Sequence, residues 1–155
     1  MSRVLPSVLT LMLLLVAAPA STSAQPRRTS SDIQAQIQKS ADLQRQALQI
    51  LTEPERAERL IGRAYTELQT AMSTMLINAS GQKSPDPLLK LNEQRMRQAL
   101  SHLQQASDML KANQSLATAS QRQEGTLPAE SGAYLGVVRN NVEQALRITS
   151  SVLVL

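Results

Sequence analysis

The sequence contains no cysteine, phenylalanine or tryptophan, and its 155 residues include only two tyrosines, Tyr65 and Tyr134. Without cysteine the chain can form no disulfide bond, thiolate zinc site, c-type haem attachment or cysteine-linked lipid anchor. Aromatic residues favour strands, so their scarcity argues against a β-sheet core. Glutamine, alanine, leucine, arginine and glutamate favour helices and are frequent here. The composition therefore predicts an all-α protein with an aliphatic core.

The first 24 residues are typical of a secretory signal peptide. A basic start at Arg3 precedes an apolar run that is densest over residues 8–18, and small residues follow up to Ala20 and Ala24. The run is shorter than the roughly 20 apolar residues of a membrane-spanning helix. We therefore expect residues 1–24 to be removed, by cleavage after Ala20 or Ala24. The mature chain would have no transmembrane segment and would be periplasmic or secreted. The alanine-rich cleavage region and the glutamine-rich remainder of the chain are typical of a bacterial protein.

Apolar residues recur at spacings of three and four in four segments, which predicts four amphipathic helices. We expect a flexible leader over residues 25–30, followed by helices over about 31–51, 53–79, 87–113 and 129–153. Ser31 with Gln34, and Thr52 with Glu55, have the spacing of capping boxes at the first two helix starts. Residues 114–125 contain few apolar side chains, so we interpret them as a weakly held connection, with continuation of the third helix as the alternative.

Four such helices bury their apolar stripes only by packing together, so residues 31–155 are predicted to form one domain, a four-helix bundle. Up-down-up-down connectivity is the simplest arrangement of these segments. The alternative is an elongated hairpin that pairs with a second chain, because seams this regular also suit coiled coils.

His102 is the only histidine, and it lies at the edge of the third apolar stripe. Histidine with methionine is a known pair of haem ligands, and four methionines remain in the mature chain: Met72, Met75, Met96 and Met109. A porphyrin site usually has bulky walls, which this chain lacks. We therefore interpret His102 as a boundary residue and the methionines as core filler, and we expect no cofactor.

The acidic residues predict neither a metal site nor a catalytic pair. A di-metal bundle needs a glutamate three residues before each histidine, and Ala99 occupies that position before His102. The carboxylates fall on exposed or capping positions of the expected helices. We therefore expect a protein that is not an enzyme, with no catalytic residues.

The net charge is +4, with basic and acidic residues interleaved as in residues 53–63. Nucleic-acid binding would favour a clustered basic stripe or aromatic residues for base stacking, and neither is present. Arginine-mediated association with an envelope surface has only weak support, because no expected helix has a strongly basic face. The apolar end, Val152–Leu155, is either packed on the bundle or a docking tail.

Residues Leu51-Thr52-Glu53-Pro54-Glu55 are similar to the Leu-Thr-x-x-Gln motif of the Spy/CpxP family of periplasmic chaperones, with Glu55 in place of the final glutamine. This resemblance, over five residues, implies a holdase that shields unfolded clients. The residues themselves favour an exported helical bundle that acts by binding another protein or by forming a homo-oligomer. A chaperone-like holdase and a carrier of haem or another small ligand are the alternatives.

Overall fold

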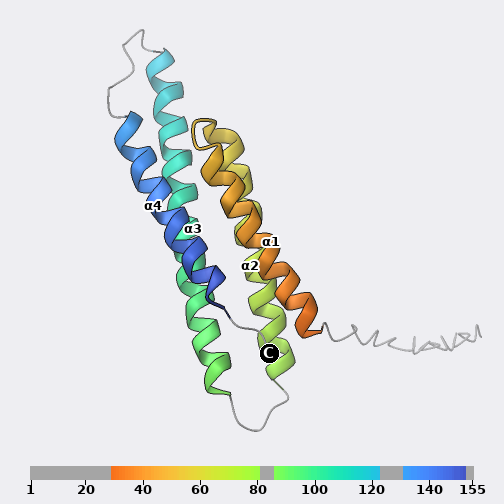
Figure 1. Cartoon of the computed structure of the whole chain (residues 1–155). Coiled ribbons are helices and arrows are strands. Elements are labelled where there is room, and N and C mark those ends of the chain that lie inside the picture. Colours follow the sequence, from red (N-terminus) through yellow and green to blue (C-terminus); the bar gives the residue numbers. More distant parts are fainter. Residues whose placement is uncertain (1–28, 81–85, 123–130, 153–155) are drawn as a thin grey trace, which may run out of the picture.

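The computed structural model describes residues 29–80, 86–122 and 131–152, and these ranges contain four helices and no strand. The helices are α1 (Ser30–Gln49), α2 (Pro54–Ala79), α3 (Pro87–Arg122) and α4 (Ser131–Ser150). Each helix packs on the next, and α4 returns to α1 (Figure 1). The all-α bundle is therefore confirmed for the described ranges. The expected signal peptide and residues 25–28 of the leader lie outside them.

The first two helices begin differently from the prediction. Thr29 is the N-cap of α1 and forms a capping box with Asp32, so Ser31 and Gln34 do not form one. Asp32 also adds a negative charge in the first turn, where the helix dipole favours it. For α2 the N-cap is Glu53, with no side-chain cap, and the box from Thr52 was wrong. Proline prefers the first helical position, which assigns the cap to the residue before Pro54.

Helix α3 is longer than predicted, because it continues to Arg122 instead of ending near residue 113. Alanine and glutamine in this stretch favour the helix. The Ser115 and Thr118 hydroxyl groups donate back to the carbonyls of Lys111 and Gln114, at 3.0 and 2.9 Å, so their polar groups have partners within the helix. Local propensity therefore extends the helix without an apolar stripe.

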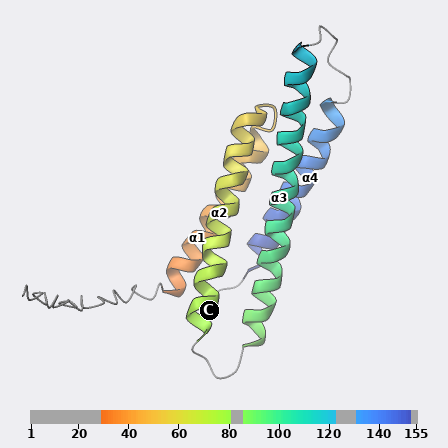
Figure 2. The ribbon, with the colours of Figure 1, turned by 180° about the vertical axis from the view of Figure 1, so that it is seen from behind.

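The end of α3 projects beyond its neighbours, as Figures 1 and 2 both show. Ser107 and Lys111 contact Glu58, close to the start of α2. His102 contacts Asn141, ten residues after the start of α4. Because these neighbours run antiparallel to α3, its residues beyond about 115 have no helix opposite them.

The core alternates small and large side chains at heptad spacing. On α2 the buried residues are Ala57, Ile61, Ala64, Leu68, Ala71 and Met75. The small residues let helices approach closely, and the Ser40 hydroxyl of α1 donates to the Ala64 carbonyl at 2.7 Å. Val152 also belongs to this core, whereas residues 153–155 lie outside the described ranges.

A fully buried polar cluster joins α1 to α4 within this core. Gln44 Nε2 donates to the hydroxyl groups of Ser40 and Thr149, at 3.1 and 3.2 Å. The Ser40 hydroxyl donates its proton to the Ala64 carbonyl, so its oxygen can only accept from Gln44. The Gln44 amide must therefore turn its nitrogen, and not its oxygen, toward Ser40. Gln44 Oε1 is consequently buried with no hydrogen-bond donor, which is unfavourable.

We expect the combined change Gln44→Met and Thr149→Val to raise the free energy of unfolding by about 1 kcal/mol, because it removes the unpartnered oxygen together with the hydroxyl group that Gln44→Met alone would leave without a donor. Urea denaturation followed by circular dichroism measures the change. Gln46→Met, at an exposed position on the same helix, is the control and should change stability by less than about 0.5 kcal/mol. A lower stability for the combined change would contradict this account of the cluster.

Candidate interaction surface

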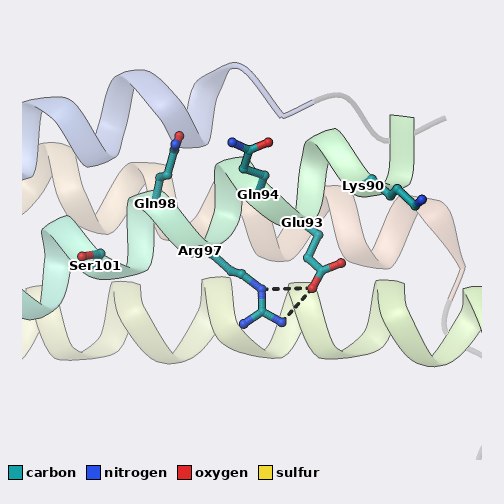
Figure 3. Close-up of a pocket in the computed structure, with 6 residues that line it drawn as sticks. All are labelled: Lys90, Glu93, Gln94, Arg97, Gln98 and Ser101. Carbon is teal, nitrogen blue, oxygen red and sulfur yellow. Dashed lines mark hydrogen bonds and ion pairs between the residues drawn. The ribbon is translucent and has the colours of Figure 1, made fainter. Parts of the chain in front are cut away.

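An open depression lies on the outer surface of α3 (Figure 3). Its lining residues are Lys90, Glu93, Gln94, Arg97, Gln98 and Ser101. All belong to one helix, so no second wall encloses a ligand as binding pockets usually require. Glu93 and Arg97 also pair with each other, at 2.7 Å. The depression is therefore part of a helix surface and is a poor small-molecule site.

Figure 3 shows that the exposed side chains of α3 divide between two directions. Gln94 and Gln98 extend to the side of α4, and Arg97 extends to the side of α2. The α2 side carries charge. There Lys111 pairs with Glu58 at 3.4 Å, and the Ser107 hydroxyl donates to the same carboxylate at 3.0 Å.

The side of α3 that borders α4 has no charged residue between Arg95 and the projecting end of the helix. Its members repeat at spacings of three and four, in a second stripe beside the core stripe. Residues of α4 continue the same surface without a charge as far as Gln144, after which Arg147 follows in the same repeat. We call these residues the neutral face: Leu91, Gln98, His102, Gln105, Met109, Ala112 and Leu116 of α3, with Ala133, Val137, Asn140 and Gln144 of α4.

Exposed apolar side chains concentrate on the neutral face. Four large apolar residues are exposed in the described part of the chain: Ile77 at 70%, Leu116 at 66%, Val137 at 47% and Leu91 at 42%. Three of the four belong to the neutral face, and Ile77 lies on α2. Leu91 and Leu116 lie about 38 Å apart along α3, so these side chains share one side of the α3–α4 pair without forming a contiguous apolar patch.

Hydrogen bonds attach the two helices beneath this face. Asn141 Nδ2 donates to the Val137 carbonyl at 3.1 Å, which directs Asn141 Oδ1 toward His102 Nδ1, 3.0 Å away. The oxygen can only accept, so Nδ1 carries the proton. Nearer one end of the face, the Arg95 guanidinium donates to the Ser151 carbonyl at 2.7 Å. These contacts hold α3 and α4 as one preformed surface.

The predicted site residues are placed as follows. His102 is partly buried at the junction of α3 and α4, in agreement with a boundary residue. Met75 and Met96 are in the core, and Met72 and Met109 pack against it. Among the described residues no three histidine, aspartate or glutamate side chains are grouped as metal ligands.

The sequence-based reasoning missed Asn141 and the neutral face. Asn141 is 39 residues from His102 along the chain, and only the packing of α3 on α4 brings them together. The neutral face had a detectable signal, because residues 98, 102, 105, 109, 112 and 116 repeat at alternating spacings of four and three without a charge. That repeat becomes meaningful once the core stripe of α3 is known.

No family model matches the chain, and no curated protein or solved structure is significantly similar to it. The likeness to the Spy/CpxP motif therefore stays confined to five residues, of which Leu51 is buried in the core. None of the helices in the described ranges combines the length and apolar content needed to cross a lipid bilayer.

We expect His102→Ala to lower the free energy of unfolding by about 1–2 kcal/mol, because it leaves the buried Asn141 oxygen without a donor. Thermal and urea denaturation measure the loss. Ser101→Ala, at the exposed neighbouring position, should have little effect. Combining His102→Ala with Asn141→Ala should cost about 1 kcal/mol less than the two single changes together. Full additivity would show that the two side chains are not coupled.

Proposed function

We propose that this chain is an exported, non-enzymatic protein that acts by binding another protein through the neutral face. The observation that carries the proposal is the coincidence of two exposed apolar side chains, Leu116 and Val137, with a surface on which α3 bears no charge between Arg95 and its projecting end. Leu91 lies just beyond Arg95. The buried centres of protein interfaces are depleted of charged residues in the same way. Elsewhere on α3 the exposed surface bears Lys90, Arg97 and Lys111.

The rigidity of the surface supports this proposal. Both helices are held by the core stripe and by the bond between His102 and Asn141. A partner would therefore meet side chains on a fixed backbone, and little conformational entropy would be lost on association. The amides of Gln98, Gln105 and Asn140 add hydrogen-bonding groups that give direction to the contact without requiring a charged partner.

Photo-crosslinking from two adjacent positions tests the proposal. A photoreactive amino acid at Gln105, on the neutral face, should give discrete protein adducts when the protein is irradiated in its own host. The same group at Gln104, which is also exposed but lies on the other side of α3 beside Asp108, should give few.

Each pattern of adducts has a separate meaning. A continuous smear of adducts from Gln105 would favour a holdase with many clients over a specific partner. Equal yields from the two positions, or none from either, would contradict the proposed use of the neutral face. The two positions are neighbours in the sequence, so expression and folding are matched between them.

Export is proposed from the sequence of the first 24 residues and has its own test. The protein recovered from the periplasm or the medium should begin at Ser21 or Gln25, because small residues precede both positions. Intact-mass measurement of the purified protein identifies the first residue. A chain that retains Met1 and stays in the cytoplasm would contradict the proposed export.

A further inference from the structure

We propose that the partner of the neutral face is a second copy of this chain, with α3 of one copy antiparallel to α3 of the other about a twofold axis. This inference rests on the proposed function and names its partner. It is carried by the chemistry, the spacing and the extent of the neutral face.

The polar groups of the neutral face are complementary to themselves. Gln98, Gln105 and Asn140 each carry an amide with two N–H donors and an accepting oxygen. A twofold interface brings one surface patch against the same patch of the other copy. Amides and apolar groups satisfy each other in that arrangement, and they need no opposite charge at the facing position of the other copy. The chain carries a net charge of +4, so an uncharged surface is where two copies approach with least repulsion.

The spacing of the α3 stripe matches an antiparallel pairing. Leu91, Gln98, Gln105 and Ala112 repeat every seven residues, and the other heptad position holds Arg95, His102, Met109 and Leu116. In an antiparallel pair, one series faces the other in reverse order. Leu91 of each copy then faces Leu116 of the other, and Gln105 faces His102 near the axis. Arg95, the charged member of the two series, faces Ala112 and keeps its guanidinium on the Ser151 carbonyl of its own chain. Both exposed leucines of α3 are covered at once, and the projecting end of α3 supplies one member of each leucine pair.

The neutral face is large enough for a stable contact. From Leu91 to Leu116, α3 is about 38 Å long, and α4 beside it widens the surface to about 15–20 Å. Each copy would bury about 600 Å², or about 1,200 Å² in total, which is at the lower end of the range for specific protein interfaces. Val137 of α4 lies near the middle of this surface and would pack against the partner there.

Sedimentation velocity of the protein purified from its own host, at increasing concentrations, tests the pairing. The unmodified protein should form dimers. Leu116→Glu should raise the dissociation constant about tenfold or more, because it places a charge against the partner's leucine. The control is Ile77→Glu, because Ile77 is exposed to the same extent, 70% against 66%, and lies on α2 away from the neutral face. It should leave the dissociation constant unchanged, and circular dichroism should show that both variants fold.

A compensating pair tests the antiparallel register. Leu91→Lys alone should weaken the dimer, as Leu116→Glu does, and combining the two changes in one chain should restore it, because each lysine would face a glutamate of the other copy. The two positions are about 38 Å apart along one helix, so they cannot compensate within a single chain. Failure of the double variant to restore the dimer would overturn this register.

Two further results would overturn the inference. One is a monomer at every concentration. The other is a dimer that Ile77→Glu disrupts and Leu116→Glu does not. A monomeric protein that still gives a discrete adduct to a different protein from Gln105 would reject the second copy as partner and keep the proposed function. A monomer that gives no adduct would reject both.

Discussion

The absence of large aromatic side chains from the core is the constraint on which the rest of the structure depends. Aliphatic residues alone must fill the space between four helices, so the helices have to lie close together. The alternation of alanine with isoleucine, leucine or methionine on α2 permits this, because each alanine leaves room for a residue of the facing helix. The bond from the Ser40 hydroxyl to the Ala64 carbonyl, at 2.7 Å, shows how closely α1 and α2 approach.

Close packing explains why the surface of α3 has two different sides. The side toward α2 contacts Glu58, so positive and hydroxyl groups there have an acceptor. The side toward α4 has Asn141 beside His102, and its one charged residue, Arg95, donates to the Ser151 carbonyl; among the described residues no carboxylate on that side forms an ion pair with α3. Amides, His102 and apolar residues fill these positions instead. The division of charge on α3 therefore follows from what each neighbouring helix provides.

The apolar periodicity predicted the bundle well, since the stripe from Ala57 to Met75 is buried throughout. Helix ends were predicted less well. Thr29, Ser30 and Ser31 are all good N-caps, and the sequence alone does not decide between them. The end of α3 was missed because its helicity comes from propensity and not from burial. Contacts between distant residues, such as His102 with Asn141 and Gln44 with Thr149, require the packed helices before they can be recognised.

The two stripes of α3 raise the question of which one the chain places inside the bundle, because both have the helical spacing that a core requires. Their chemistry distinguishes them. Met96, Leu103 and Leu110 belong to the buried stripe, whereas glutamine and histidine occupy the middle of the neutral face. Burying Gln98, Gln105 and His102 in the bundle would desolvate groups with few hydrogen-bond partners there, which disfavours rotation of α3 about its own axis.

The same polar residues would weaken a dimer relative to an all-leucine face, but they would favour one register, as a single buried asparagine does in coiled coils. Polar residues in the neutral face thus serve the fold of the single chain and, in the proposed dimer, the pairing of two.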